Sequence, residues 1–390
     1  MSHSEKIPKE VVEITIEKIV PGGEGMARVD GRVLFVAGVL PGEQVRVAIM
    51  EAKKDFARGH LLEVLVPSAD RIVPPCSLAG RCGGCDWQHI RDSGQAQLKI
   101  AMVRDALLRT GGLDYPTLEI ETGSPWGYRN RLQIHGNASG QLGFLERRGH
   151  DLVHVQQCMV SHPAFGSLFA QGDASKSGTR FHAFGCEEQD GSYRLWQENA
   201  NTEVKGKVTL LGKEFSFPVA GFFQSNLEML ARLIPYALDG LNGSIAWDFY
   251  AGVGVFGVFL AEHFKKVICV ESNAKALVFA KQNLSGKESE YLTGRLEELL
   301  VDPHCSLRRK KPDAIVLDPP REGLAQPVRS FLKECQVAHL VYVSCNPVTL
   351  ARDLKDLLAG PYVLDSLRLF DFYPQTSHVE AVAKFRLRSD

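Results

Sequence analysis

Four apolar strand patterns that alternate with helical patterns constrain the fold of this chain most strongly. They are Ala246–Tyr250, Lys266–Val270, Ala314–Leu317 and His339–Val343. Strands that alternate with helices in this way form a doubly wound parallel sheet, because each helix carries the chain back to the same edge of the sheet. In such a sheet, ligands bind beyond the carboxyl ends of the strands. The sequence therefore predicts an α/β domain after Ala220, with its site at that edge.

A glycine-rich turn follows the first of these strands. Gly252, Gly254 and Gly257 match the pattern G-x-G-x-x-G at the start of a predicted helix. Glu271 ends the next strand, where a carboxylate can bind a ribose hydroxyl. This combination suits either a dinucleotide or S-adenosylmethionine. Asp318, which begins an Asp-Pro-Pro-Arg run after a later strand, favours S-adenosylmethionine, because it places a carboxylate and two rigid prolines over a reaction centre.

The strand-to-helix turn at Cys345 carries the candidate nucleophile. Pro347 suits the first position of a helix, where its missing N–H costs no hydrogen bond, and Asn346 stands at the N-cap. Cys345 would then lie near the positive end of a helix dipole, which lowers the pKa of a thiol and favours the thiolate. The alternative is a buried, unreactive cysteine. We therefore expect a reactive thiol only if other catalytic groups surround it.

The first part of the chain contains only strand patterns, separated by turn signals such as Pro41-Gly42. The patterns are Val11–Ile16, Arg32–Val36, Gln44–Val47 and His60–Val64. Short strands at this spacing predict a small closed barrel of the oligonucleotide-binding kind. Acidic and basic residues nearly balance here, so the residues alone leave the ligand of the barrel open.

Three cysteines follow at the spacing C-x5-C-x2-C: Cys76, Cys82 and Cys85, with glycines between them. Cys158 is a distant fourth candidate. Four thiolates suit tetrahedral zinc or a [4Fe–4S] cluster, and scattered structural thiols are the alternative. Nine cysteines in a long chain without a signal segment argue against a disulfide framework. Because the spacing is not the C-x3-C-x2-C of radical chemistry, we expect a structural staple.

The region from about Pro116 to Pro218 alternates between short strand patterns and turns, and it follows a helical pattern at Gln95–Arg109. It also contains arginines beside aromatic residues. The arginines are Arg129, Arg131, Arg147 and Arg148. Such a cluster can stack bases and hold phosphates, although a solvated surface is the commoner meaning.

The composition is that of an ordinary globular protein, with 44% hydrophobic and 23% charged residues. A net charge of −1 in 390 residues gives no hint of nucleic acid. No apolar run approaches the ~20 residues of a membrane span, and the N-terminus lacks an apolar signal core. We therefore expect a cytoplasmic protein that makes no contact with a membrane.

Together, several motifs resemble the RNA uracil-5 methyltransferases. They are Asp248–Gly257, Glu271, Asp318–Arg321, Ser344–Pro347, Pro374–Glu380 and, resembling the family's FxQxN box, Phe222–Asn226. The N-terminal barrel resembles a TRAM domain, an RNA-binding barrel of RNA-modifying enzymes. The resemblance covers nearly the whole chain and is strongest to the branch that methylates 23S ribosomal RNA. It implies a TRAM domain at residues 1–67, a central β domain at 68–85 and 118–218, and a Rossmann-like methyltransferase domain at 86–117 and 219–390.

The resemblance also implies roles for individual residues. S-adenosylmethionine would contact Gln224, Tyr250, Glu271 and Asp318; Cys345 would be the nucleophile and Glu380 the base; and Cys76, Cys82, Cys85 and Cys158 would hold a [4Fe–4S] cluster. Val255 and Arg295 depart from the family, which often places a small polar residue near the cofactor at these positions. Their effect on cofactor binding is left open.

The implied chemistry explains why these residue types are needed. Carbon 5 of uracil is a poor nucleophile, so a thiolate first adds to carbon 6, and a base later removes the proton from carbon 5. The target base would leave its stack to reach Cys345. The residues do not separate 23S ribosomal RNA from the T-loop of transfer RNA, and the oligomeric state, for which we expect a monomer, is not readable from them.

Four other functions stay open at this point. An amino-methyltransferase would follow Asp-Pro-Pro with an aromatic residue, but position 321 is Arg321. An RNA cytosine-5 enzyme would carry its thiol directly after the Asp-Pro stretch, where none stands. An NAD-linked oxidoreductase and a catalytically silent RNA-binding scaffold remain compatible with the fold. A binding assay with S-adenosylmethionine and NAD would distinguish a methyltransferase from the oxidoreductase. A Cys345 variant would distinguish an enzyme, which loses activity, from the silent scaffold.

Overall fold

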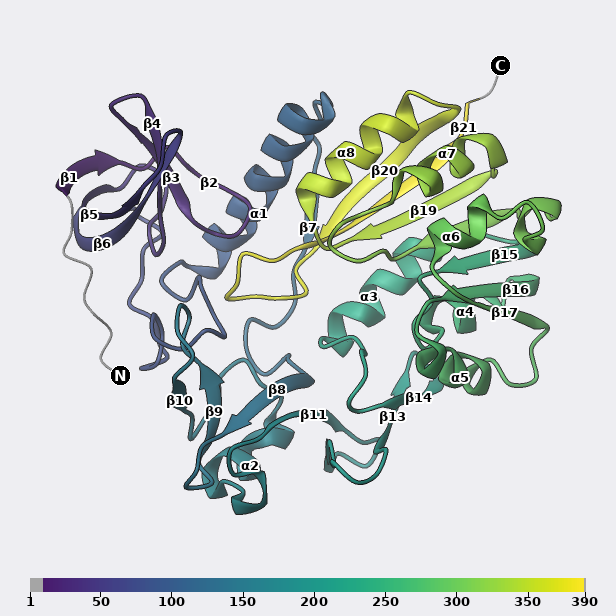
Figure 1. Cartoon of the computed structure of the whole chain (residues 1–390), viewed down its shortest axis with the longest axis horizontal. Helices are drawn as coiled ribbons and strands as arrows, with labels where there is room; N and C mark the ends of the chain where they lie inside the picture. Colours follow the sequence, from purple (N-terminus) through teal and green to yellow (C-terminus); the bar gives the residue numbers. More distant parts are fainter. Residues whose placement is uncertain (1–9, 389–390) are drawn as a thin grey trace. The chain divides into compact units, whose positions relative to one another are not determined.

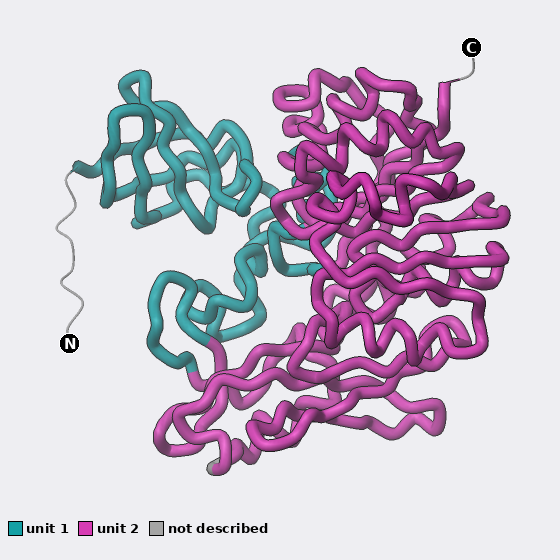
Figure 2. Tube along the Cα trace, turned by 45° about the vertical axis from the view of Figure 1, so that its right-hand side comes forward, with its two compact units in different colours: residues 1–102, 145–153, 373–378 teal, residues 103–144, 154–372, 379–390 magenta. Residues whose placement is uncertain are grey.

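The computed structural model describes residues 10–388, which divide into two compact units (Figure 2). Unit 1 contains the described residues up to Met102 together with 145–153 and 373–378. Unit 2 contains 103–144, 154–372 and the described residues from Val379. The N-terminal residues that were searched for an apolar signal core lie outside the described part of the chain. Within that part, no helix combines the length and apolar character that crossing a membrane requires.

Unit 1 begins with a six-stranded sheet of order β1-β5-β6-β4-β3-β2 (Figure 1). Its strands are β1 (Glu10–Thr15), β2 (Lys18–Ile19), β3 (Gly25–Val29), β4 (Arg32–Val36), β5 (Gln44–Ala52) and β6 (Phe56–Val66). Leu34, Val36, Val45 and Val47 are at most 1% exposed and form its core. Gly59 is required by this packing, because a Cβ there would lie 2.2 Å from Cγ1 of Val47. All four expected strands are confirmed.

The rest of unit 1 packs around two buried aromatic and aliphatic side chains, Trp87 and Ile90. The fully buried Lys99, on α1 (Asp92–Ala106), lies over the Trp87 ring and donates to the Tyr373 carbonyl at 3.1 Å. The Gln375 carbonyl accepts from the N–H groups of Asp86 and Trp87 at 3.1 and 3.0 Å. Residues 373–378 therefore fold against the segment that follows the three cysteines.

The central region contains two antiparallel sheets and short helices. The five-stranded sheet has the order β10-β9-β8-β11-β12, and β13 pairs with β14. Its elements are β8 (Arg131–Gly136), β9 (Leu142–Leu145), β10 (Leu152–His154), η2 (Pro163–Phe165), α2 (Gly166–Gln171), η3 (Ala174–Lys176), β11 (Arg180–Glu187), β12 (Tyr193–Gln197), β13 (Lys205–Leu210) and β14 (Lys213–Pro218). Rings of Phe184, Phe217 and Phe223 contact one another, the last two stacked at 4.2 Å. This aromatic cluster anchors the loop that precedes Gln224.

An eight-stranded sheet forms the main layer of unit 2, in the order β17-β16-β15-β18-β19-β21-β20-β7. The strands are β7 (Glu119–Glu121), β15 (Gly243–Phe249), β16 (Phe264–Glu271), β17 (Ser289–Thr293), β18 (Ala314–Leu317), β19 (His339–Ser344), β20 (Tyr362–Phe370) and β21 (Glu380–Leu387). The helices are α3 (Leu227–Leu238), α4 (Val255–Leu260), α5 (Ala274–Asn283), α6 (Leu296–Val301), α7 (Gln326–Cys335) and α8 (Pro347–Leu358), with η1 (Leu107–Gly111) and η4 (Ser306–Arg309).

Helices cover both faces of this sheet, as a doubly wound fold requires. Figure 1 shows α6, α7 and α8 along one face and α3, α4 and α5 along the other, and neighbours within each set contact one another. Strands β17, β16, β15, β18 and β19 run parallel, whereas β21 runs antiparallel to β19 and β20. The predicted α/β fold is confirmed, and the start of β21 lies at the same edge as the ends of the parallel strands.

Candidate active site

The glycine turn after β15 is shaped by close packing. Tyr250 and Gly252 adopt positive φ angles of 62° and 55°, and Gly254 one of 82°. A Cβ on Gly254 would lie 2.8 Å from Cδ1 of Leu284, so only glycine fits there. A Cβ on Gly252 would meet no atom within 4 Å, which leaves the space beside this residue open to a ligand.

Two carboxylates hold this turn in place. Oδ2 of the buried Asp248 accepts from the Gly257 N–H at 2.7 Å, and Oε2 of Glu271 accepts from the Gly252 N–H at 2.9 Å. Burial, and secondarily the carboxylates of Asp318 and Glu271, raise the pKa of Asp248 to about 8. Oε1 of Glu271 accepts from the N–H of Asn273 at 2.7 Å. Glu271 therefore acts as a backbone clamp at the expected ribose position.

The segment around Gln224 connects the aromatic cluster to α3. Phe223 is buried, whereas the Phe222 ring is 66% exposed. Asn226 caps α3 by accepting from the Met229 N–H at 3.0 Å and donates to the Phe372 carbonyl at 3.0 Å. Gln224 is half-buried and makes no side-chain hydrogen bond with residues 10–388, so its amide is available to a ligand.

The loop after β18 is tied to the helix that follows Cys345. The Arg321 carbonyl accepts from Nδ2 of Asn346 at 2.9 Å and from the Thr349 hydroxyl at 3.1 Å. Oδ1 of Asn346 accepts from the Val348 N–H at 3.0 Å, as an N-cap does. The predicted cap and the position of Pro347 at the start of α8 are confirmed. These bonds hold the turns that carry Asp318 and Cys345 against each other.

The expected lowering of the Cys345 pKa is wrong for the free enzyme. Burial raises the pKa of this thiol to about 11, and the carboxyls of Glu380 and Asp318 raise it further, with Arg321 opposing them. The helix terminus is present, but desolvation and two nearby acids outweigh it. Cys345 is half-buried rather than enclosed, so it can still meet a substrate.

Glu380 lies beside Cys345 because of the strand order. β21 is antiparallel to β19, and its residue Ala381 pairs with Ser344. Glu380, the first residue of β21, therefore lies beside the end of β19, which Cys345 directly follows. Glu380 is 9% exposed, and its carboxyl makes no hydrogen bond or ion pair with any described residue. Burial, followed by the Asp318 charge, holds the Glu380 pKa well above its usual range, while Arg321 opposes this.

Asp318 and Tyr250 complete the cluster. Asp318 is half-buried and its backbone N–H donates to the Phe249 carbonyl at 3.3 Å; burial raises the pKa of its carboxyl to about 7. Burial also raises the pKa of Tyr250, and the Glu297 carboxylate adds to this. The structure thus gathers Tyr250, Glu271, Asp318, Cys345 and Glu380 at one edge of the sheet.

A buried aspartate behind Cys345 was not recognisable from sequence. Asp353 is fully buried, and its Oδ2 accepts from the Tyr342 hydroxyl at 2.9 Å and from the Leu324 N–H at 2.8 Å. Its Oδ1 accepts from Nε of Arg352 at 2.8 Å and lies 3.4 Å from Nη1 of Arg329. The network joins β19, α8 and the loop after Asp318. Its only signal in the sequence is Asp353 itself, one helical turn after Thr349.

The two departures from the family pattern lie near this edge. Val255 is buried at the first position of α4. Arg295 precedes α6, and its guanidinium lies 2.5 Å from the carboxylate of Glu297. The charge of this carboxylate also raises the pKa of Tyr250. Val255 has no polar side-chain group, and the guanidinium of Arg295 is 66% exposed and paired with Glu297.

The four candidate cluster ligands fall into different parts of the chain. Cys76, Cys82 and Cys85 belong to unit 1 and Cys158 to unit 2. None forms a disulfide, and the Gly84 N–H points at Sγ of Cys82 at 3.5 Å. Across residues 10–388, no three His, Cys, Asp or Glu side chains are gathered as metal ligands would be. Four thiols are the donor set that such a cluster needs, and three of the four lie in unit 1.

The arginines of the central region mostly serve the protein itself. The guanidinium of Arg131 donates to the Gly221 carbonyl at 2.7 Å, and Nε of Arg129 donates to the Arg131 carbonyl at 3.3 Å. In unit 1, Arg148 pairs with Glu24 at 2.8 Å. The neighbouring Tyr128 is only 5% exposed. Of the two aromatic residues beside these arginines, Tyr128 is therefore closed to base stacking, whereas Trp126 is half-buried.

Comparison with protein families identifies two regions of the chain. Residues 7–62 match the TRAM domain, and residues 295–386 match the tRNA (uracil-5-)-methyltransferase family. The second match contains Asp318, Cys345 and Glu380. An uncharacterised RNA methyltransferase of Halalkalibacterium halodurans is 30% identical over 449 residues, which cover 97% of this chain and 98% of that protein. One from Bdellovibrio bacteriovorus is 32% identical over 395 residues, covering 97% and 95%.

A solved structure has the same fold along nearly the whole chain. The tRNA (uracil-54, C5)-methyltransferase of Pyrococcus abyssi, crystallised with S-adenosyl-L-homocysteine, superimposes with a TM-score of 0.74 at 22% identity. The match covers 96% of this chain and 100% of that one. At this identity the likeness establishes the fold, including the Rossmann-like layer expected from the alternating strands.

Proposed function

This chain belongs to the RNA uracil-5-methyltransferase family and uses S-adenosylmethionine to methylate RNA, and we propose that its target is carbon 5 of a specific uridine in 23S ribosomal RNA. We further propose that the reaction proceeds through a covalent bond between Cys345 and carbon 6 of the uracil. The observation that carries this proposal is the convergence of a thiol and two acids, Cys345, Asp318 and Glu380, at the carboxyl edge of the sheet.

The proposed steps assign one task to each group. The Cys345 thiol loses its proton, and its sulfur adds to carbon 6 of uracil, which places enolate density on carbon 5. Carbon 5 takes the methyl group, which S-adenosylmethionine supplies from its sulfonium, leaving S-adenosylhomocysteine. The ionised Glu380 removes the proton from carbon 5, the carbon 6–sulfur bond breaks, and the double bond re-forms with release of the thiolate. The net products are 5-methyluridine, S-adenosylhomocysteine and one proton.

The raised pKa values of Cys345 and Glu380 suit a reaction in which both groups ionise only after the methyl donor has bound. In the free enzyme, burial favours the neutral forms of both Cys345 and Glu380. Arg321 lowers both pKa values, and a cationic methyl donor nearby would act in the same direction. The nucleophile and the base would therefore ionise most readily when the methyl donor is bound.

Residues around the glycine turn are the proposed cofactor contacts. Within residues 10–388 the Gln224 amide has no hydrogen-bond partner, Gly252 borders open space, and Glu271 ends β16, where we expect the ribose to bind. Tyr250 begins the turn, and Asp318 lies close enough to Cys345 to raise the pKa of its thiol. These features support the assignment of Gln224, Tyr250, Glu271 and Asp318 to S-adenosylmethionine.

We retain Cys76, Cys82, Cys85 and Cys158 as proposed ligands of a [4Fe–4S] cluster with a structural role, because four thiolates are the ligand set that such a cluster needs. No step of the proposed reaction passes through the cluster. Measurement of iron and sulfide in anaerobically purified protein, compared with a Cys82→Ser variant, tests this assignment. Equal iron and sulfide contents in the two proteins would contradict it.

Transfer RNA is the second candidate substrate, because residues 295–386 match a family described as tRNA (uracil-5-)-methyltransferase. The deciding experiment maps 5-methyluridine in 23S ribosomal RNA and in transfer RNA from cells with and without this gene. Loss of one ribosomal 5-methyluridine supports the first candidate. Loss confined to the T-loop of transfer RNA would replace it with the second, and unchanged RNA would contradict both.

A further inference from the structure

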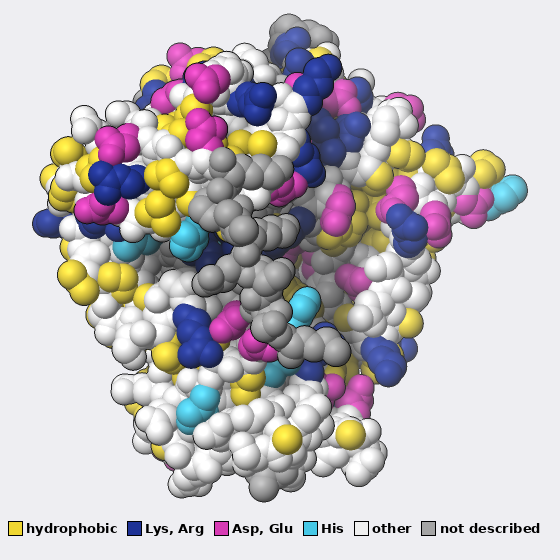
Figure 3. All heavy atoms as spheres, turned by 60° about the vertical axis from the view of Figure 1, so that its left-hand side comes forward, with side chains coloured by type: hydrophobic (Ala, Val, Ile, Leu, Met, Phe, Trp, Pro, Cys, Tyr) yellow, Lys and Arg dark blue, Asp and Glu magenta, His cyan; other side chains and the backbone are white. Residues whose placement is uncertain are grey.

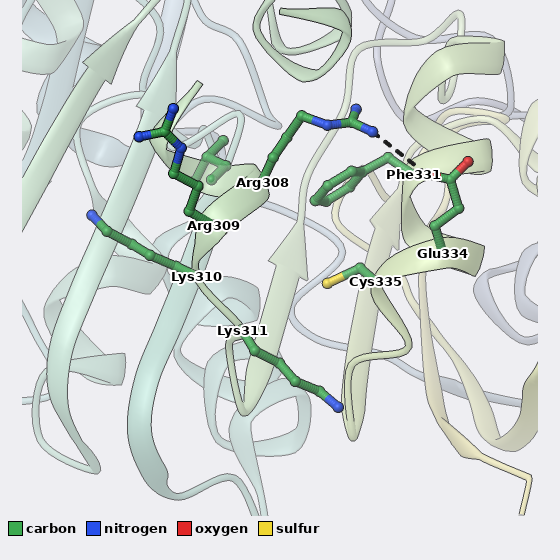
Figure 4. Close-up of a pocket in the computed structure, with 8 residues that line it drawn as sticks. Arg308, Arg309, Lys310, Lys311, Phe331, Glu334 and Cys335 are labelled. Atoms are coloured by element: carbon green, nitrogen blue, oxygen red, sulfur yellow. Dashed lines mark ion pairs between the residues drawn. The ribbon is translucent and has the colours of Figure 1, made fainter. Parts of the chain in front are cut away.

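A strongly basic pocket lies away from the catalytic groups of unit 2. It has a volume of about 300 Å³ and is lined by the consecutive residues Arg308–Lys311, at the end of η4, and by Glu334 and Cys335 of α7 (Figure 4). Four cations and one carboxylate are among its lining residues, in a chain whose net charge is −1. On the molecular face drawn in Figure 3, acidic side chains lie among basic ones over most of the surface, and several Lys and Arg side chains gather near its top.

Two of the four cations have protein partners. Nη1 of Arg308 donates to the Leu300 carbonyl at 2.5 Å, and its Nη2 lies 3.7 Å from the Glu334 carboxylate. Nζ of Lys310 lies 2.5 Å from the Glu290 carboxylate, which also pairs with Lys266. These contacts hold the loop in place, and they pair Glu334 with Arg308 and Glu290 with Lys310.

Arg309 and Lys311 are different. Both side chains are exposed, and neither makes a hydrogen bond or an ion pair with any residue from 10 to 388. Figure 4 shows them leaving the loop in different directions. Two exposed cations without acidic partners keep their full charge for an external anion, and their divergence suits two separate anionic groups rather than one.

The pocket offers charge but no surface for a base. The Phe331 ring is 7% exposed and stacks on Trp247, and Leu307 is fully buried. Recognition of unpaired bases relies on exposed rings, whereas arginine and lysine suffice for phosphates. The ligand that fits is a phosphodiester backbone, bound without regard to sequence.

The position of the pocket separates it from the target base. Lys311 precedes β18 and Asp318 follows it, so the pocket lies at the amino edge of the sheet and the catalytic groups lie at the carboxyl edge. Seven residue steps separate Lys311 from Asp318, and at ~3.3 Å per step these span at most about 23 Å. An RNA strand that contacts the pocket is therefore a different part of the substrate from the uridine at Cys345.

We propose that Arg309 and Lys311 form a second RNA-binding site, which contacts backbone phosphates of the substrate at the edge of the sheet opposite the active site. This inference rests on the proposed RNA methylation. It means that a large folded RNA is held at two places, whereas a short RNA occupies only the catalytic edge.

The test compares binding of two probes by the full-length enzyme. The variant is Arg309→Ala/Lys311→Ala, and the matched control is Lys275→Ala/Lys281→Ala, which removes two exposed lysines from α5. The probes are an unmodified 23S ribosomal RNA transcript and an RNA of about six nucleotides, a length that one groove can hold. Dissociation constants are measured between about 50 and 300 mM KCl, because phosphate contacts make affinity depend on salt.

We expect the Arg309/Lys311 variant to bind the transcript roughly tenfold more weakly at low salt, with a salt slope smaller by about 1.5. Its binding of the short RNA and its melting temperature stay as in the wild type, and the control pair changes none of these values. If the variant binds the transcript with wild-type affinity and wild-type salt slope, the proposal is overturned. This holds even if the variant binds an acidic protein less well than the wild type, because the pocket would then be a protein-binding site. An equal loss in the control pair also overturns it. Failure of the proposed methylation shows separately, as absence of 5-methyluridine in RNA treated with the wild-type enzyme.

Discussion

Two buried glutamates in different regions of the molecule show how differently one side chain can be used. Glu43, at the edge of the N-terminal sheet, is fully buried, and Glu380, at the start of β21, is 9% exposed. Burial alone would raise the pKa of Glu43, but bonds from Arg71 and from two backbone N–H groups outweigh it and lower the pKa. Arg71 donates through Nε and Nη2 at 2.5 and 2.7 Å. Glu380 has no such donor among the residues that the structure describes, and its pKa is raised.

The difference is one of satisfied and unsatisfied charge. An ionised carboxylate surrounded by donors stabilises the fold, and Glu43 connects the N–H groups of Leu40 and Ser68 to Arg71. A buried carboxyl without donors favours its protonated form and costs stability once it ionises. The strand edge around Glu380 therefore carries a destabilised acid that is available for chemistry, whereas the region around Glu43 carries an acid that only holds structure.

The largest expected effect concerns the thiol beside Glu380. Cys345→Ala removes the proposed nucleophile, and we expect methylation to fall by more than about 10³-fold, since the proposed covalent activation of carbon 5 would be lost. Incorporation of labelled methyl groups into unmodified RNA measures this. The control is Cys335→Ala, which removes a half-buried thiol away from the catalytic edge and leaves the charges of the basic pocket in place. Full activity of Cys345→Ala would contradict the proposed covalent mechanism at the carboxyl edge of the sheet.

The next test exchanges the two glutamates for glutamine. Glu380→Gln removes the proposed base for the carbon 5 proton, so we expect turnover to fall by about 10²–10⁴-fold while an RNA–protein adduct accumulates on a denaturing gel. Because the raised pKa of Glu380 gives stability that is present near pH 4 and lost as pH rises towards that pKa, the variant should melt at or above the wild-type temperature at pH 8.

Glu43→Gln should do the reverse. We expect normal turnover and a loss of roughly 2–3 kcal/mol of unfolding free energy at neutral pH, because Arg71 loses its ionic partner. The lowered pKa of Glu43 means that this contribution disappears as pH falls through that pKa, so the two proteins should converge in acid. If Glu43→Gln impaired catalysis or Glu380→Gln impaired folding, the contrast between the two regions would be wrong.

At the carboxyl edge of the unit 2 sheet, the sequence predicts the helix cap and the strand bounds better than it predicts the pKa values. The N-cap at Asn346 and the bounds of Ala314–Leu317 follow from neighbouring residues, and both are confirmed. The burial of Glu380 depends on β21 lying between β19 and β20, and the raised pKa of Cys345 depends on acids 27 and 35 positions away. Such effects come from distant strands brought together, so a local pattern such as the helix start predicts the wrong sign. The Asp353 network is missed for the same reason.

The pH dependence of the thiol tests the electrostatic part of the comparison. With a pKa of about 11, Cys345 is protonated at neutral pH, so its alkylation by iodoacetamide should rise about tenfold per pH unit between pH 7 and 9. S-adenosylmethionine should shift this profile to lower pH. Cys335 also has a pKa raised to about 11 by burial, but it lies outside the site, and its profile should not respond to the methyl donor. Peptide mass spectrometry measures both thiols in one sample, and a Cys345 plateau below pH 7 without donor would contradict the assignment.

Asp353 extends the comparison, since it is fully paired like Glu43 but lies behind the catalytic turn. Asp353→Asn should slow adduct formation in the Glu380→Gln background by about tenfold, because Asp318 and Cys345 lose their common support, while affinity for S-adenosylmethionine is kept. Tyr342→Phe removes a single bond of 2.9 Å and should cost only about 1 kcal/mol of unfolding free energy. A loss of stability in Asp353→Asn with an unchanged adduct rate would make the network purely structural.

The smallest effect is expected at the exposed charges of the N-terminal sheet. Arg46 lies 2.8 Å from the Glu13 carboxylate and 2.5 Å from that of Glu63, but the three side chains are 41–60% exposed. Water and salt screen such pairs, and ordering long side chains offsets most of their attraction. Arg46→Ala should therefore leave the melting temperature unchanged within error, at low and at high salt. A clear loss of stability would show that distance alone, and not the burial that separates Glu43 from Arg46, decides how much a charge contributes in this region.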